Sequence, residues 1–179
     1  MRIISGKYKS KVMRAPQGLP TRPTTDRAKE GLFSWMNARF DMEGLVVMDL
    51  FCGTGNICYE FISRGASKII AVDKHPACVK FVREQFSQFE PGDFQVFCTD
   101  AKVAIERSKD TFDIVFADPP YDYKEHLYLA NAVMNAGLLK PDGIFIMEHP
   151  AEINFKHHPG WLETRHYGRV YFSFFNFQS

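Results

Sequence analysis

From residue 45 onward, short apolar runs alternate with longer amphipathic stretches. Runs such as LVVMDLF have the length and composition of buried strands, whereas stretches such as NICYEFISRG have helical spacing and a closing glycine. Alternating strands and helices predict an α/β domain with a mostly parallel sheet covered on both faces. The expected strands cover residues 45–51, 68–73, 94–100, 112–118 and 143–149, and the expected helices cover 56–65, 76–89, 101–108 and 124–137.

The two ends of the chain follow other patterns. The last stretch, LETRHYGRVYFSFFNF, predicts two strands joined by a turn at Tyr167-Gly168, so that an antiparallel hairpin closes one edge of the sheet. Its aromatic residues Phe172, Phe174, Phe175 and Phe177 are expected to fill the core. The first 23 residues are interrupted by glycines and prolines, which predicts a short hairpin followed by irregular chain. A helix then starts with Thr24 or Thr25 as its N-cap and ends near Asn37.

Length and composition indicate one compact domain, because 179 residues with 45% hydrophobic side chains suffice for a single core. We expect a basic N-terminal arm at 1–23 and a cofactor-binding and catalytic body at 24–179. Residues 1–30 hold eight Lys or Arg against two acidic residues, a net charge of +6, whereas the remaining residues have a net charge of −5. A basic segment on an acidic body indicates a polyanionic partner that binds at one end.

The hydrophobic pattern and the spacing of cysteines and histidines argue against several classes of protein. No apolar run is long enough to cross a bilayer, and the basic N-terminus lacks the apolar region of a signal peptide, so we expect a cytoplasmic protein without membrane contact. The cysteines are widely spaced and form no C-x-x-C pair, which argues against zinc and disulfides and favours reduced, mostly buried thiols. We also expect surface or turn roles for the histidines near the C-terminus, and no metal. The cysteines are Cys52, Cys58, Cys78 and Cys98, and the histidines are His149, His157 and His158.

Four predicted strand ends carry an aspartate: Asp49, Asp73, Asp100 and Asp118. In open α/β sheets, ligands bind outside the carboxyl ends of the strands, where the strand order switches. One acid at a strand end is often only a cap or a turn former. Four of them indicate a ligand site at this edge.

The first of these ends begins a glycine loop, Asp49-Leu-Phe-Cys-Gly-Thr-Gly-Asn56. Gly53 and Gly55 would let the backbone approach a ligand, and Asp73 follows Gly53 by 20 residues, as an acid that binds ribose does. A nicotinamide dinucleotide is disfavoured because Cys58 stands where its motif needs a third glycine and Asp49 would repel a pyrophosphate. S-adenosylmethionine fits better, since it offers an ammonium, a ribose and an adenine without phosphate. Asp100 could accept from the adenine amino group.

The sequence Asp118-Pro119-Pro120-Tyr121 follows another predicted strand. An exocyclic amino nitrogen is a poor nucleophile because its lone pair is delocalised into the ring. The Asp118 carboxylate and the Pro119 carbonyl could accept its two N–H groups and direct the lone pair at a methyl carbon. The two prolines fix the backbone, and Tyr121 could stack on the extruded base.

Together these segments resemble the RsmD family, which methylates the N2 of a guanine in bacterial small-subunit ribosomal RNA. The similar segments are RIISG at 2–6, RPTTDRAKEGLF at 22–33, DLFCGTGN at 49–56, SRGA at 63–66 and DPPY at 118–121. The resemblance implies a Rossmann-like class I methyltransferase fold, with cofactor roles for Asp49, Gly53, Gly55, Asp73 and Asp100 and catalytic roles for Asp118, Pro119 and Tyr121. The candidate cofactor site also includes their neighbours Phe51, Lys74 and Ala101. Phe51 and Cys52 suit packing beneath the glycine loop better than a role in the chemistry.

The resemblance also implies the substrate, a ribosomal RNA within an assembled or assembling small subunit. We expect the protein to act as a monomer. The candidate RNA-binding residues are Arg2, Lys7, Arg22, Thr24, Thr25 and Arg27, of which the two threonines could instead only cap the helix. Three alternatives stay open on the residues alone: an adenine-N6 methyltransferase on DNA or RNA, a nicotinamide-dependent oxidoreductase, and a non-catalytic RNA-binding assembly factor.

Overall fold

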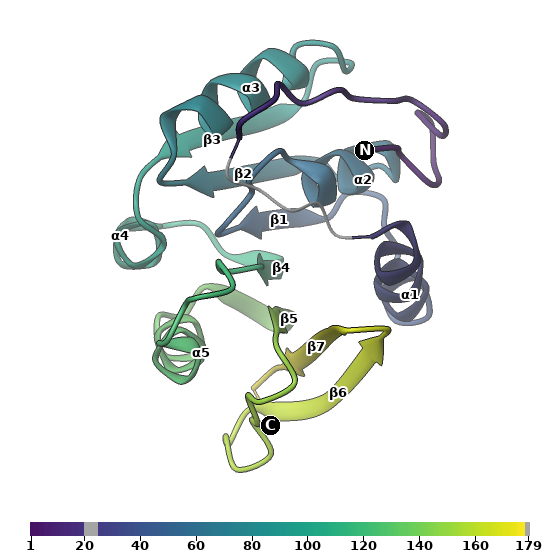
Figure 1. The fold of residues 1–179 in the computed structure, drawn as a ribbon. Coiled ribbons are helices and arrows are strands. Elements are labelled where there is room, and N and C mark those ends of the chain that lie inside the picture. The colour runs from purple at the N-terminus through teal and green to yellow at the C-terminus, as the bar shows by residue number, and fades with distance from the viewer. Residues whose placement is uncertain (20–24, 178–179) are drawn as a thin grey trace.

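The computed structural model describes residues 1–19 and 25–177, which build a seven-stranded sheet with helices on both faces (Figure 1). The strand order is β3-β2-β1-β4-β5-β7-β6, and the first five strands in the chain run parallel. The predicted α/β fold with a mostly parallel sheet is therefore confirmed. The strands are β1 (Val46–Asp49), β2 (Lys68–Asp73), β3 (Asp93–Cys98), β4 (Phe112–Ala117), β5 (Leu139–His149), β6 (Trp161–Tyr167) and β7 (Val170–Phe175).

Two apolar layers hold the helices to the sheet. On one face α1, α2 and α3 pack over a cluster that includes Leu32, Phe61 and Val82, and on the other α4 and α5 pack over a cluster that includes Ile105 and Leu129. Because the strands between these layers are covered on both sides, their sequences are nearly continuous apolar runs. The helices are α1 (Asp26–Asn37), α2 (Asn56–Ser63), α3 (Pro76–Phe86), α4 (Ala101–Arg107) and α5 (His126–Asn135).

The path of the chain through the sheet places the candidate ligand edge. From β1 the chain moves outward to β2 and β3, returns to β4 beside β1, and continues outward in the other direction. The strand order thus switches between β1 and β4. Helices on opposite faces leave this point, which is where open α/β sheets bind their ligands.

The C-terminal hairpin is present, with β7 inserted antiparallel between β5 and β6. Tyr167 pairs with Val170, so the turn residues are Gly168 and Arg169, and the predicted turn at Tyr167-Gly168 was one residue too early. The glycine takes the position that needs a positive φ, 66°. Phe172, Phe174 and Phe175 are buried as predicted, whereas Phe177 lies beyond β7 and is exposed, because the strand ends at Phe175.

Three helices are clearly shorter than the sequence predicts: α5, expected over 124–137, covers His126–Asn135, α2, expected over 56–65, covers Asn56–Ser63, and the third is α3. α3 was expected to reach Phe89 but ends at Phe86, and the next three residues form a turn. Phe89 leaves the helix to stack on Tyr59 of α2 and to meet the edge of Tyr8 from the N-terminal segment. Contacts with residues distant in the sequence therefore decide where this helix stops.

The N-terminal segment folds back on itself and joins the core. Arg2 and Val12 form an antiparallel bridge, which confirms the predicted short hairpin. Ile3 and Met13 are buried in the same apolar cluster as α1 and α2. The segment is thus packed against the sheet domain through its own hydrophobic residues.

A buried carboxylate on α2 holds this segment in place. Glu60, fully buried, accepts hydrogen bonds from the backbone N–H groups of Ile4 (2.9 Å) and Ser5 (3.0 Å) and from the Arg64 guanidinium (2.8 Å). Lys29 of α1 is also fully buried, with its Nζ 3.4 Å from Glu60. Burial lowers the pKa of Lys29, and the nearby carboxylate opposes that shift. The sequence analysis identified neither Lys29 nor Glu60.

We expect Glu60→Ala to destabilise the protein by about 3 to 5 kcal/mol, because the buried Lys29 ammonium and two backbone N–H groups would lose their acceptor. The free energy of unfolding in urea measures this effect. Glu90→Ala is the matched control, since Glu90 is exposed and pairs with the exposed Lys7, and it is expected to change stability by less than about 1 kcal/mol. Equal effects of the two substitutions would contradict the anchoring role of Glu60.

Candidate active site

The acids predicted at the strand ends meet at one edge of the sheet. Asp49 is the last residue of β1 and lies opposite Ala71 of β2 and Phe116 of β4. Asp73 lies two residues after Ala71, and Asp118 lies two residues after Phe116. The two acids therefore flank Asp49 on either side. The fourth, Asp100, is further out, after β3 at the start of α4. The first three surround the switch in strand order.

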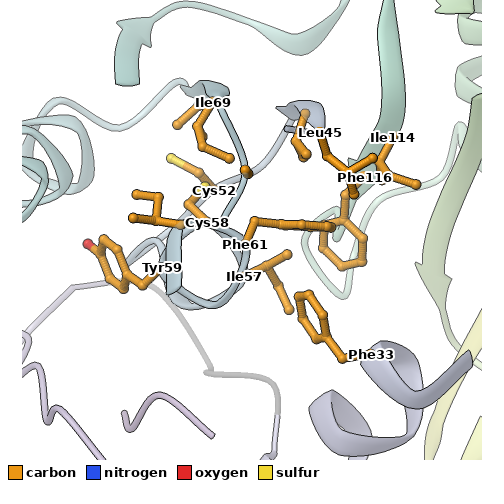
Figure 2. Packing of buried hydrophobic residues seen from close by; sticks show 14 of the residues in the cluster. Phe33, Leu45, Cys52, Ile57, Cys58, Tyr59, Phe61, Ile69, Ile114 and Phe116 are labelled. Carbon is orange, nitrogen blue, oxygen red and sulfur yellow. The ribbon is translucent and has the colours of Figure 1, made fainter. Parts of the chain in front are cut away.

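The glycine loop turns tightly from β1 into α2. Gly53 and Gly55 both have a positive φ, 51° and 80°, and the Gly55 N–H closes the turn on the Cys52 carbonyl. A Cβ on Gly55 would lie 2.5 Å from the ring of Tyr59. Figure 2 shows Tyr59 together with Cys52 and Cys58 in the packing around α2. In this structure Gly55 is thus required by the backbone turn and by an internal aromatic contact.

Asp49 is a buried acid whose carboxylate accepts only weak hydrogen bonds. The residue is only 2% exposed, and its oxygens accept from the Phe51 N–H (3.2 Å) and the Cys58 thiol (3.3 Å). Burial raises the pKa of Asp49 to about 7, and the negative charges of Asp118 and Asp73 add to the rise. Within residues 1–19 and 25–177, no basic side chain forms an ion pair with it. A ligand ammonium would supply that missing charge.

The other candidate cofactor residues have defined local partners. Asp73 accepts from the Gly53 N–H and from the His75 N–H, both at 2.8 Å, so its carboxylate ties the glycine loop to the end of β2. Asp100 caps α4 by accepting from the Lys102 N–H at 2.8 Å. Lys74 is exposed beside Asp73, whereas Ala101 is buried under the start of α4.

The catalytic candidates form a turn directly after β4. Pro119 is buried and Pro120 exposed, and the Pro120 carbonyl accepts from the Tyr123 N–H at 2.8 Å. Burial of the carboxyl group raises the pKa of Asp118 to about 7, although part of the residue still contacts solvent. Tyr121 is 88% exposed, so its ring is free to meet a substrate.

This turn and the glycine loop are joined by aromatic packing. The Phe51 ring, from the loop, meets the edge of Tyr123 with centroids 5.7 Å apart. Tyr123 in turn packs edge-on against His126, the buried first residue of α5. The sequence analysis treated Phe51 as cofactor-binding or packing and did not identify Tyr123. An aromatic residue two positions after Tyr121 was the available signal.

The candidate RNA-binding residues are spread over the surface. Arg2 pairs with Asp26 at 3.0 Å, Lys7 pairs with Glu90, and Arg27 is exposed on the first turn of α1. Thr25 is the N-cap of α1, and its hydroxyl accepts from the Ala28 N–H at 3.3 Å, which accounts for it structurally. Two further candidates, Arg22 and Thr24, lie outside the described residues.

The expectation about His149 needs correction, whereas the expectation that the cysteines are mostly buried is confirmed. His149 is not a surface residue: it is 5% exposed and hydrogen-bonded on both ring nitrogens, because β7 covers it. Cys52, Cys58 and Cys78 are buried free thiols, and Cys98 is exposed. Among the residues that the structure describes, no cluster of His, Cys, Asp and Glu could hold a metal ion. Nor is any helix in these ranges long and apolar enough to cross a membrane.

A family model described as conserved hypothetical protein 95 matches residues 1–176. The chain belongs to this family. It is 33% identical to the putative rRNA methyltransferase YlbH of Bacillus subtilis (strain 168) over 157 residues, 86% of this chain and 84% of that protein. It is 25% identical to the ribosomal RNA small subunit methyltransferase D of Escherichia coli (strain K12) over 152 residues, 85% of this chain and 76% of that protein.

A solved structure described as the putative methyltransferase yhhF from Escherichia coli superposes with a TM-score of 0.84. It shares 24% identity with this chain, and the match covers 98% of this chain and 96% of that one. The Rossmann-like methyltransferase fold of the family is therefore the fold of this chain. The match to the methyltransferase D sequence also confirms the resemblance to the RsmD family.

The raised pKa of Asp49 predicts a stability that falls with pH. A carboxyl whose pKa is about 7 when folded and about 4 when unfolded favours the folded state less as pH rises between these values. Asp49→Asn removes this cost, so we expect the ligand-free variant to gain on the order of 2 kcal/mol at pH 8 and to show a flatter pH profile.

Urea unfolding between pH 4.5 and pH 8 measures the profile, with the exposed Asp142→Asn as the control that leaves it unchanged. Asp49→Asn is also expected to lose cofactor affinity, which calorimetry measures. A pH profile identical to that of the native chain would contradict the buried, unpaired state of Asp49.

Proposed function

We propose that this protein transfers a methyl group from S-adenosylmethionine to the N2 amino group of a guanine in small-subunit ribosomal RNA. The observation that carries the proposal is the pair of acids at the switch in strand order, the buried Asp49 and the partly buried Asp118, whose pKa values are both raised to about 7. The names of the related proteins, an rRNA methyltransferase and a small subunit methyltransferase D, support the substrate class.

The cofactor fits the chemistry of this edge. The buried Asp49 carboxylate can bind the methionyl ammonium, which would supply the counter-charge that no described basic side chain provides. Asp73 retains acceptor capacity for ribose hydroxyls besides the two N–H groups that it holds, and Asp100 lies beyond it for the adenine. When bound, S-adenosylmethionine supplies an electrophilic methyl group on a sulfonium.

The residues after β4 act on the substrate amine. The Asp118 carboxylate and the Pro119 carbonyl accept its two N–H groups, which fixes the direction of the nitrogen lone pair. Holding the amine in line for displacement accounts for much of the acceleration. Asp118 then takes the proton that the nitrogen loses, at the carboxyl oxygen. The pKa of about 7 suits this group to accept a proton near neutral pH.

The face available to RNA includes exposed cations of the N-terminal segment. Arg2 and Lys7 are partly neutralised by Asp26 and Glu90, whereas Lys9 and Arg14 are exposed. We place the RNA backbone along these side chains and Arg27. The substrate is a small subunit during or after assembly, and the protein acts in the cytoplasm as a monomer with one methyltransferase domain over 1–179.

Methylation of small subunits from a strain that lacks this protein tests the proposal. Incubation with the enzyme and labelled S-adenosylmethionine, followed by RNA digestion and nucleoside analysis, is expected to yield N2-methylguanosine. Recovery of labelled N6-methyladenosine instead would show that the target is adenine, whose exocyclic amine also presents two N–H donors. Tight RNA binding without any transfer would favour the assembly-factor alternative, and binding of NAD would favour an oxidoreductase.

Substitution of Asp118 separates catalysis from binding. Asp118→Ala is expected to lower the methyl-transfer rate by roughly a hundredfold or more and to leave affinity for S-adenosylmethionine largely unchanged, because this acceptor acts mainly in the transition state. Single-turnover kinetics and calorimetry measure the two quantities. The exposed neighbour Asp122 provides the control variant, Asp122→Ala. A native methyl-transfer rate in Asp118→Ala would show that Asp118 is not needed for catalysis.

A further inference from the structure

Three aromatic rings form a ladder across the C-terminal part of the sheet. Tyr171 of β7 is paired with His149 of β5 on one side and with His166 of β6 on the other. The ring centroids of Tyr171 and His166 are 5.3 Å apart at an interplanar angle of 26°, and those of Tyr171 and His149 are 6.0 Å apart at 38°. Exposure increases along the ladder, from the buried His149 through the partly buried Tyr171 to the exposed His166.

The ladder begins beside the catalytic turn. Ala117 of β4 pairs with Met147 of β5, so two residues further along each chain lie Pro119 and His149. The three rings then lead away from this turn toward the end of the β6–β7 hairpin. In Figure 1, α5 lies near β5 and the hairpin extends beyond it. The outer rings thus continue the candidate active-site edge.

A chain of hydrogen bonds fixes the inner ring. The Trp161 indole N–H donates to Thr164 (3.0 Å), whose hydroxyl can therefore donate to Ser173 (2.7 Å), which in turn donates to His149 Nε2 (2.7 Å). Because the Pro150 carbonyl only accepts, His149 Nδ1 carries the hydrogen in the remaining bond (2.9 Å). Both nitrogens are satisfied and burial lowers the pKa of His149, so the ring is neutral and held rigidly.

We propose that the exposed His166 ring, stacked on Tyr171, forms a stacking surface for a nucleotide next to the methylated guanine. A target base that is extruded into the site leaves neighbouring bases unstacked, and aromatic side chains replace the lost stacking. Arg169, exposed in the turn of the same hairpin, gives this end of the hairpin a positive charge that suits phosphates. This inference rests on the proposed RNA substrate.

Substitution of the outer ring tests the inference. His166→Ala removes an exposed side chain and is expected to weaken binding to unmethylated small subunits by roughly 5- to 100-fold, as loss of one stacking contact does. His166→Phe keeps a flat ring and is expected to bind RNA within about threefold of the native chain. Filter binding at fixed salt measures affinity, and steady-state kinetics are expected to show a larger rise in KM for RNA than fall in kcat.

Two controls make the result specific. Leu162→Ala changes an exposed residue at the opposite end of β6, and it is expected to leave RNA affinity unchanged. Calorimetry with S-adenosylmethionine is expected to give the same affinity for every variant. Equal RNA affinity of His166→Ala and the native chain would overturn the stacking surface, whereas absence of methyl transfer by the native chain would overturn the proposed function itself.

Discussion

The Glu60 carboxylate is the internal contact on which the arrangement around the candidate site depends. It lies on α2, whose first residue follows the glycine loop, and it joins this helix to the N-terminal segment and to α1. Lys29 extends the connection, since its ammonium also donates to the Asn56 side chain at 2.9 Å and to the Arg2 carbonyl at 2.6 Å. A buried charge left unpaired is costly, so these segments are strongly held together.

This cluster also explains why a basic N-terminal segment belongs to the folded domain. Its charge alone suggests a solvated arm, yet Ile3 and Met13 are buried and the backbone between them is bound to α2. The same cluster lies behind the glycine loop, through Asn56.

At the carboxyl edge of the sheet, two acids lower the stability of the ligand-free fold. Burial raises the pKa of the buried Asp49 and of the partly buried Asp118 to about 7, so ionising either of them near neutral pH is costly. Such strained ionisation is common at functional sites because a ligand charge can relieve it. The switch in strand order concentrates the two acids there, and the hairpin strand β7 extends the same edge with aromatic rings.

The sequence alone determined the elements and the residues with local chemical meaning. Apolar runs, glycines and strand-end acids depend on short-range geometry, and they correctly predicted the parallel strands, the glycine loop, the turn after β4 and the C-terminal hairpin. The candidate site residues could be named because their spacing follows from the alternation of strand and helix.

Only the tertiary structure decided which distant residues meet. The pairing of Lys29 with Glu60, the end of α3 at Phe86, the burial of His149 and the packing of Phe51 on Tyr123 all depend on segments far apart in the chain. Local pattern carries no information on such contacts, because a buried charge and an exposed one look alike in sequence. Their energies depend on desolvation, which is fixed only when the layers have packed.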